Sequence, residues 1–122
     1  MTIKAIAPQL RTTDMAATIA FYTEMLGFSI AFNYQDFYVG ITVGNQMLHL
    51  KHIDETDPSI RFVDLGGHLH LYFDVEDVTS FADQLKAKGV HLVKEVHETD
   101  WNTREIVLYD DQGHTLYFGE QL

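Results

Sequence analysis

The chain has 122 residues, of which 46% are hydrophobic, and its 18 Asp and Glu against 8 Lys and Arg give a formal charge of −10. This length fits one domain, residues 1–122, with a single core. The charge argues against nucleic acid as a partner, because phosphates are bound through Lys and Arg. Since the chain has no cysteine, disulfides, nucleophilic thiols and thiolate metal sites are excluded.

The hydropathy pattern also limits where the protein acts. No apolar run approaches the ~18 residues that a membrane span needs. The first residues, MTIKAIAPQLRTTD, lack the basic start and long apolar stretch of a signal peptide. We therefore expect no membrane partner and a cytoplasmic location.

The first half of the chain predicts one strand, one helix and three strands. The first strand is expected over residues 4–11, with Ile6 and Leu10 toward the core. Asp14 is suited to cap a helix that Gly27 ends. The apolar face of that helix is expected to consist of Met15, Ile19, Tyr22 and Leu26. Strands are then predicted over residues 28–34, 37–43 and 46–52.

The second half repeats this order after a connector. Residues 54–66 form the one long linker, in which Pro58 favours a loop. A strand over 67–74 precedes a helix that Glu76 or Asp77 opens and Gly89 ends. The expected apolar face of this helix consists of Val78, Phe81, Ala82 and Leu85. Strands follow over 90–97, 103–109 and 114–120, the last two joined by a turn at 110–113.

The chain therefore reads as the same unit written twice, with a period of about 60 residues. We predict an α+β fold of two tandem modules, with module one at about 1–53 and module two at about 67–122. Alternation along each strand separates a core face from an opposite face. The opposite face collects polar and aromatic side chains, namely Gln9, His49, His68, His70, Tyr72, Glu105 and Tyr117.

Such a mixture of hydrogen-bonding and aromatic groups is typical of a small-molecule site, and we expect these residues to bind a ligand. The alternative is a solvated sheet face that carries some histidines. A histidine–carboxylate pair for acid–base chemistry could form between His68 or His70 and Glu105. The remaining histidines are interpreted as surface or turn residues: His52, His91, His97 and His114.

Three segments carry a resemblance to a known family. DMAATIAFYTEMLGF, from Asp14 to Phe28, resembles the first-helix motif of the vicinal oxygen chelate superfamily, which includes glyoxalase I, extradiol dioxygenases and bleomycin-resistance proteins. DWNTRE, which ends at Glu105, and DDQGH, which ends at His114, are similar to segments near the end of bleomycin-resistance-like members. The resemblance implies two βαβββ modules that form a curved, half-open mixed sheet around a central cavity, in a homodimer.

The resemblance also implies four metal-ligand positions, one on each of four strands. These positions hold Ala7, His49, His68 and Tyr117. Only the two histidines can be ordinary ligands, whereas a catalytic divalent metal site normally keeps three protein ligands. We therefore expect no cofactor, and the alternative is a divalent metal (Zn, Ni, Mn or Fe) at His49 and His68.

Three functions follow from these residues. The first is a metal-free small-molecule binder that sequesters a polar or cationic organic ligand in a groove of a dimer. Trp101, which matches the aromatic residue of the bleomycin-resistance segment, is then a groove residue; otherwise it packs at a sheet edge or dimer contact. The second is a metal-dependent lyase, isomerase or ring-cleaving dioxygenase that uses His49 and His68. The third is an interaction module whose own side chains fill the cavity.

Overall fold

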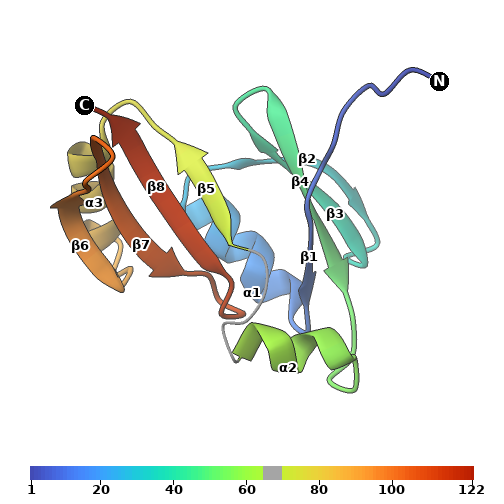
Figure 1. Ribbon diagram of the computed structural model, residues 1–122. Helices are drawn as coiled ribbons and strands as arrows, with labels where there is room; N and C mark the ends of the chain where they lie inside the picture. The colour runs from blue at the N-terminus through green and yellow to red at the C-terminus, as the bar shows by residue number, and fades with distance from the viewer. Residues whose placement is uncertain (65–69) are drawn as a thin grey trace. The chain divides into compact units, whose positions relative to one another are not determined.

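The computed structural model describes residues 1–64 and 70–122, which divide into two units, Met1–Arg61 and Phe62–Leu122. Each unit contains a strand, a helical segment and three strands in that order along the chain (Figure 1). A short additional helix, α2 (Pro58–Asp64), joins them. The predicted fold class, α+β with two tandem βαβββ modules, is confirmed.

The first unit is a four-stranded sheet with one helical segment. Its elements are β1 (Gln9–Thr12), α1 (Met15–Ala20), the π-helical turn η1 (Phe21–Met25), β2 (Ser29–Tyr34), β3 (Tyr38–Val43) and β4 (Gln46–His52). The strand order is β1-β4-β3-β2. β1 lies parallel to β4, while the two other pairs are antiparallel. The long connection through α1 makes the parallel pair possible.

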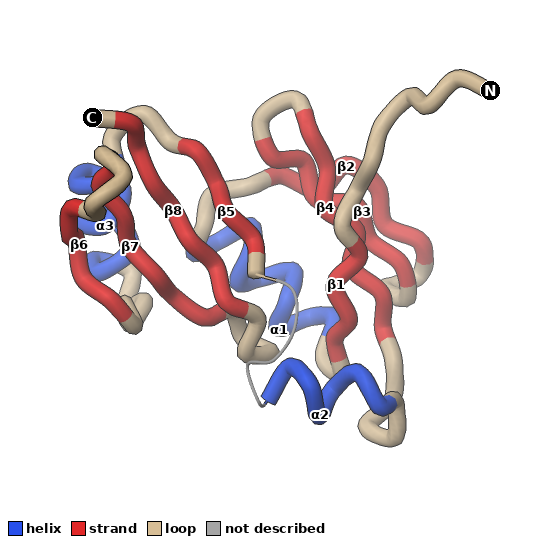
Figure 2. Tube along the Cα trace, viewed as in Figure 1, coloured by secondary structure: helices blue, strands red, loops and turns tan. Residues whose placement is uncertain are grey.

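The second unit repeats this topology. Its elements are β5 (Leu71–Asp74), α3 (Val78–Ala87), β6 (Lys94–Glu98), β7 (Thr103–Tyr109) and β8 (Thr115–Gln121). The strand order is β5-β8-β7-β6, again with one parallel pair, β5 and β8. Helix α3 contacts β6, β7 and β8 and so covers one face of this sheet (Figure 2).

Equivalent aspartates begin the two main helices. The side chain of Asp14 accepts a hydrogen bond from the Ala17 N–H (3.1 Å), and that of Asp77 accepts one from the Ser80 N–H (3.0 Å). Each occupies one of the backbone N–H groups that the first helical turn leaves unpaired. Asp77, rather than Glu76, is thus the cap.

Both helical segments end at the predicted glycines. Gly27 and Gly89 have φ values of +80° and +84°, a left-handed conformation that glycine adopts without steric cost. The first helix widens into a π turn before it ends, with the Leu26 N–H bonded to the Phe21 carbonyl (3.1 Å). The sequence pattern predicts a helix here, but does not distinguish the π turn.

The buried side chains follow the predicted alternation on most strands. In the first unit Leu10, Val39, Ile41, Leu48 and Leu50 face the core together with Met15, Tyr22 and Leu26 of the helical segment. In the second unit the buried set includes Val78, Ala82, Leu85, Ile106, Leu108, Leu116 and Phe118. The opposite face of each sheet is therefore free to carry the candidate site residues.

Two predicted strands are shorter than expected. The first begins at Gln9 instead of residue 4, and Ile6, predicted in the core, is 92% exposed. Pro8 lies just before the observed start and has no N–H to donate to a ladder, which accounts for the late start. The strand predicted over 90–97 is observed as Lys94–Glu98, so only its second half is correct.

The predicted linker is also wrong in part, because residues 58–64 form α2. Pro58 stands at the first position of this helix, where a missing N–H costs nothing. Asp57 precedes it and accepts a hydrogen bond from the Ser59 N–H (2.8 Å), as a capping residue does. Its carboxylate also forms an ion pair with Arg11 (2.9 Å).

Of the strand predicted over 67–74, Leu71–Asp74 is observed, and residues 67–69 lie outside the described part of the chain. Within the described residues, no helix is both long and apolar enough to cross a membrane.

Candidate functional site

The two sheets place their candidate residues at equivalent positions. Gln9 and Tyr72 each stand five residues before the aspartate that caps the following helix, Asp14 or Asp77. Gln9 is paired in register with His49, and Tyr72 is paired with Tyr117. His49 and Tyr117 are therefore counterparts in the two units.

The same comparison relates the third strands of the two sheets. Gly40 pairs with His49, and Val107 pairs with Tyr117. Two residues earlier on each strand stand Tyr38 and Glu105, which are thus counterparts as well.

In the first unit, Gln9, Tyr38 and His49 form a hydrogen-bonded chain. The Gln9 Nε2 donates to the Tyr38 hydroxyl at 2.9 Å, and that hydroxyl lies 2.9 Å from His49 Nδ1. The contact reaches across three strands, because β4 lies between β1 and β3 in the sheet.

Aromatic packing holds this chain in place. The Phe32 ring stacks on Tyr38 (centroids 6.3 Å, planes 4° apart) and meets His49 edge-on (5.7 Å, 74°). These are favoured geometries for aromatic pairs. Gly40 makes room for the ring, since a Cβ there would lie 2.3 Å from Phe32 Cε1. The side chain of His49 thus has few orientations open to it.

A groove of about 890 Å³ lies next to His49 in the first unit. Ligand pockets usually fall between about 300 and 1,000 Å³, so the groove is large enough for a small organic molecule. Its lining is formed by Lys4, Ala5, Ile6, Ala7, Thr42, Gly44, Asn45, Gln46, Met47 and His49. The mixture of apolar side chains with two amides, a hydroxyl, an ammonium and an imidazole suits a polar organic ligand.

In the second unit, the Tyr72 hydroxyl donates to Glu105 Oε2 at 3.1 Å, the counterpart of the contact between Gln9 and Tyr38. Glu105 is only 4% exposed and accepts a second hydrogen bond from the Thr103 hydroxyl (2.8 Å). The hydroxyl end of Tyr72 lies over Gly119, where an added Cβ would come within 1.9 Å of its oxygen. The Tyr72 side chain therefore crosses Gly119 to contact the Glu105 carboxylate.

The environment of Tyr72 shifts its titration. Loss of solvent around the hydroxyl raises the pKa of Tyr72, and the hydrogen bond to Glu105 and the charge of that carboxylate raise it further. The side chain as a whole is still 52% exposed, because only its hydroxyl end is enclosed by Gly119 and Glu105. Tyr72 is thus a neutral hydrogen-bond donor well beyond neutral pH.

Rings extend this surface along the second sheet. Tyr117 stacks on Tyr72 (centroids 6.5 Å, planes 18° apart) and lies 5.9 Å from the His70 ring. A second hollow of about 370 Å³ is lined by His70, Val93, Lys94, Val107, Tyr109, Thr115 and Tyr117. The described hydrogen-bond partners of Glu105 are the hydroxyls of Tyr72 and Thr103. These contacts do not favour the acid–base pair that was predicted between His70 and Glu105.

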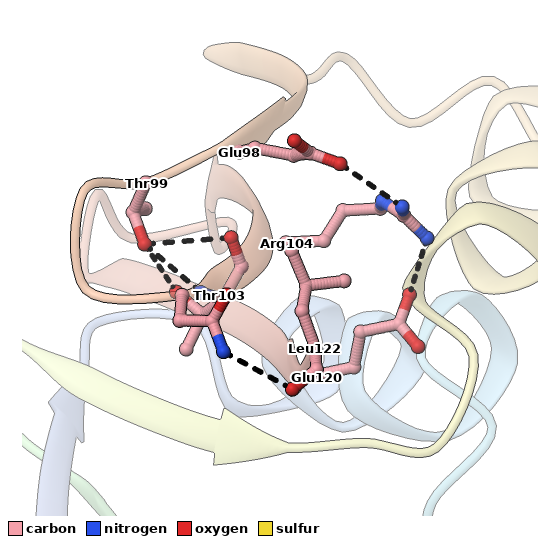
Figure 3. A network of polar contacts seen from close by, with 7 residues as sticks. Glu98, Thr99, Thr103, Arg104, Glu120 and Leu122 are labelled. Carbon is pink, nitrogen blue, oxygen red and sulfur yellow. Dashed lines mark hydrogen bonds and ion pairs between the residues drawn. The ribbon is translucent and has the colours of Figure 1, made fainter.

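Trp101 lies in the turn between β6 and β7 and is 68% exposed. The turn is closed by Thr99, whose hydroxyl lies 2.7 Å from that of Thr103. Beyond it, Arg104 bridges Glu98 (3.1 Å) and Glu120 (3.4 Å), as Figure 3 shows. These ion pairs raise the pKa of Arg104, chiefly through its hydrogen bond to Glu98.

The described residues do not fit a catalytic divalent metal. Ala7 lines the groove beside His49 but has no donor atom. The Nδ1 of His49 is taken by Tyr38, and Tyr117 offers a phenol that stacks on Tyr72. Among residues 1–64 and 70–122, no three His, Asp or Glu side chains gather as a metal site requires. The other predicted ligand, His68, lies outside the described residues.

The structure thus brings the predicted residues together in two sets. Gln9 and His49 meet in the first unit, and His70, Tyr72, Glu105 and Tyr117 gather in the second. Sequence reasoning missed Tyr38 and Phe32. Tyr38 could have been found, because it alternates with the apolar Val39 on the same strand and so falls on the site face.

His114 was predicted to be a surface or turn residue, and the predicted exposure of its side chain was wrong. It follows the β7–β8 turn but is only 3% exposed. Its Nδ1 lies 2.8 Å from Asp110 Oδ2, and its backbone N–H donates to Asp110 Oδ1 (2.9 Å). The carboxylate supplies the polar partner that lets an imidazole be buried, which the turn sequence alone did not reveal.

Comparison with known proteins places these observations in a family. The profile of the Glyoxalase/Bleomycin resistance protein/Dioxygenase superfamily matches residues 2–118. A comparison with curated proteins finds no match.

Several solved structures share the fold. UcmS2 is 20% identical, with a TM-score of 0.82 and 98% of each chain covered. A lactoylglutathione lyase from Agrobacterium tumefaciens is 20% identical, with a TM-score of 0.73 over 98% of this chain and 96% of its own. A glyoxalase/bleomycin resistance protein/dioxygenase from Alicyclobacillus acidocaldarius is 14% identical, with a TM-score of 0.77 over 98% and 92%. At these identities the likeness concerns the fold alone.

Proposed function

Because the chain belongs to the Glyoxalase/Bleomycin resistance protein/Dioxygenase superfamily, we propose that it binds and sequesters a small polar or cationic organic molecule without a metal. The observation that carries this proposal is the groove beside His49. The Nδ1 of His49 is already bonded to Tyr38. The second metal-ligand position that the family resemblance gives to this unit is Ala7, whose side chain cannot bind a metal. The groove therefore offers hydrogen bonds and apolar contact in place of a metal.

Charge supports a ligand that carries a positive group. The chain has a formal charge of −10, which raises the local concentration of cations near its surface. In the second unit, the two described hydrogen bonds to Glu105 come from the neutral hydroxyls of Tyr72 and Thr103. Neither partner carries a positive charge, so the buried carboxylate, 4% exposed, adds to the negative charge of this unit.

The proposal includes a homodimer in the cytoplasm. Strand β2 is an edge strand whose residues are all exposed, and it carries Ile30 and Tyr34, at 47% and 60% exposure. An apolar sheet edge of this kind favours pairing with another chain. In the first unit, the residues proposed to contact a ligand are Gln9 and His49. In the second unit they are His68, His70, Tyr72, Trp101, Glu105 and Tyr117.

Thermal unfolding in the presence of a library of polar and cationic aromatic compounds tests the proposal. A compound at 100 times its Kd stabilises the native state by about 2.7 kcal/mol, which raises Tm by a few degrees. His49→Ala is expected to reduce that shift. His52→Ala is the matched control, because His52 is exposed on the same strand and outside the groove.

Metal content of protein purified without a histidine tag gives the opposing outcome. Near-stoichiometric Zn, Ni, Mn or Fe that disappears in the His49→Ala, His68→Ala double variant would overturn the metal-free proposal. It would instead favour a metal-dependent lyase, isomerase or dioxygenase.

A further inference from the structure

The hydrogen-bonded chain of Gln9, Tyr38 and His49 has a direction. The amide nitrogen of Gln9 can only donate, so the Tyr38 oxygen is the acceptor at 2.9 Å. The hydroxyl keeps one proton of its own, and His49 Nδ1 lies 2.9 Å away. If each donor proton makes one hydrogen bond, Gln9 donates to Tyr38 and Tyr38 donates to His49.

This direction favours one tautomer of His49, because it is the one in which the Tyr38 hydroxyl proton is also used. When Nδ1 accepts the phenol proton, it holds a lone pair, and the single proton of the neutral imidazole must be on Nε2. The nitrogen that Tyr38 leaves for a ligand is therefore a donor.

Packing gives the chain the rigidity that a fixed tautomer needs. Phe32 lies against both Tyr38 and His49, and Tyr38 meets His49 edge-on with centroids 5.3 Å apart. Tyr38 and His49 are half-buried, whereas Gln9 is exposed, so bulk water competes chiefly at the Gln9 end of the hydrogen-bonded chain.

We propose that Gln9 and Tyr38 are positioning residues that hold His49 as the Nε2–H tautomer, so that the site selects a ligand with an acceptor oxygen, such as a carbonyl or carboxylate. This inference rests on the proposed function, in that the groove beside His49 is taken as the ligand site. The same tautomer would disfavour a metal on the Nε2 of His49, because a metal needs an unprotonated ring nitrogen.

The second unit shows that the direction is a property of particular residues and not of the fold. There the counterpart contact runs from Tyr72 to Glu105 and ends on a carboxylate. The chain also contains a histidine, His114, whose contact favours the other tautomer. An ionised Asp110 can only accept, and His114 then carries a proton on Nδ1. His114 is thus an internal reference for the other protonation pattern.

Nitrogen-15 NMR of the ring nitrogens tests the proposal without any ligand. At about pH 8.5, two units above the usual imidazole pKa of about 6.5, neutral rings report their tautomer directly. We expect His49, assigned by comparison with His49→Ala, to show a protonated Nε2 and a bare Nδ1. A protonated Nδ1 on His49, as on His114, would overturn the proposal.

Two variants separate the relay from a merely structural role. In Gln9→Glu, the carboxylate can only accept, so Tyr38 must donate toward residue 9 and accept from His49. The proton of His49 is then expected to move to Nδ1. Tyr38→Phe keeps the aromatic packing and removes the hydroxyl, so an averaged population of both tautomers is expected. An unchanged tautomer in both variants would contradict the relay.

Two ring compounds test the ligand class. Pyridine N-oxide, whose only hydrogen-bonding group is an acceptor oxygen, is expected to shift the His49 Nε2 resonance in the wild type. Benzylammonium, which has no acceptor atom, is expected to leave the His49 Nε2 resonance of the wild type unchanged, even where it binds elsewhere on the acidic surface. The reverse pattern would overturn the acceptor class.

The tautomer measurement is independent of the proposed function. A protonated Nε2 with no ligand found in thermal unfolding would count against sequestration alone. A protonated Nδ1 together with ligand binding would count against the relay alone.

Discussion

At the scale of single residues, the second unit encloses one phenol hydroxyl between a glycine and a carboxylate. Gly119 has no side chain, and this lets the Tyr72 oxygen lie where a Cβ would be only 1.9 Å away. The hydroxyl then reaches the buried Glu105 at 3.1 Å. Loss of water and the nearby negative charge both disfavour the tyrosinate form.

We predict that Glu105→Gln lowers the pKa of Tyr72, because it removes the negative charge beside the hydroxyl. The pKa should stay above its ordinary value, since the enclosed position that contributes most to the shift is kept. Tyrosinate absorbance during alkaline titration measures this. The difference between each protein and its Tyr72→Phe form isolates Tyr72 among the six tyrosines. A rise of the pKa in Glu105→Gln would contradict the account.

The same shift has a consequence for stability. The folded state binds the phenol proton more tightly than the unfolded state, whose pKa is about 10. The contribution of Tyr72 is therefore present below that pH and is lost as pH rises through the higher pKa of the folded state.

At the scale of elements, the β7–β8 turn depends on one buried carboxylate. Asp110 Oδ1 accepts from the backbone N–H groups of Gln112 and His114, each at 2.9 Å. Its Oδ2 lies 2.8 Å from His114 Nδ1. One side chain thus shapes the turn and holds the histidine that begins the return strand.

We predict that Asp110→Asn destabilises the protein by about 1 to 3 kcal/mol, because the amide can replace Oδ1 but sets a second donor against His114 Nδ1. The adjacent Asp111→Asn, at an exposed position of the same turn, is the control and should change stability by less than about 0.5 kcal/mol. Urea denaturation followed by circular dichroism measures both. Equal effects of the two substitutions would show that Asp110 has no special role.

The elements also show what the sequence could predict. Both helices, their aspartate caps and their terminal glycines follow from local signals, and alternation placed Leu50, Ile106 and Phe118 in the core. The start of β1 could not be predicted from alternation. The alternating pattern continues through Pro8, whereas the hydrogen bonding between strands does not, because proline has no N–H. Helix α2 was missed because proline was interpreted as a loop residue, although it also suits the first turn of a helix.

The candidate site was predicted by face but not by contact. Alternation indicated that Gln9 and His49 share a face, whereas their link through Tyr38 depends on strand order, which pairs β1 with β4 and puts β3 beyond it. The contact of Glu105 with Tyr72 likewise joins residues that are 33 positions apart along the chain.

At the scale of the whole molecule, the exposed edge of the first sheet has no partner strand among the described residues. Ile30 and Tyr34 of β2, and Phe37 in the turn that follows, are between 46% and 60% exposed. Exposed apolar side chains on an unpaired strand are a liability that natural proteins usually cover.

We predict that the protein sediments with twice the chain mass of 14.0 kDa, and that charges on β2 reduce this to the monomer. The variant is Ile30→Asp with Tyr34→Asp, since an aspartate on the edge opposes burial against another chain. Val93→Asp is the control, because Val93 is a similarly exposed apolar residue (43%) of the second unit. A wild-type monomer at all concentrations would contradict the dimer.

The exposed position of the sole tryptophan decides which optical signal reports on each process. Trp101 is 68% exposed in the folded protein, so its emission should change little when the chain unfolds in urea. Fluorescence is therefore a poor indicator of folding for this molecule, and circular dichroism is the better choice. The same insensitivity gives a quiet background, on which a bound compound or a second subunit that covers the indole would be detected as a blue shift.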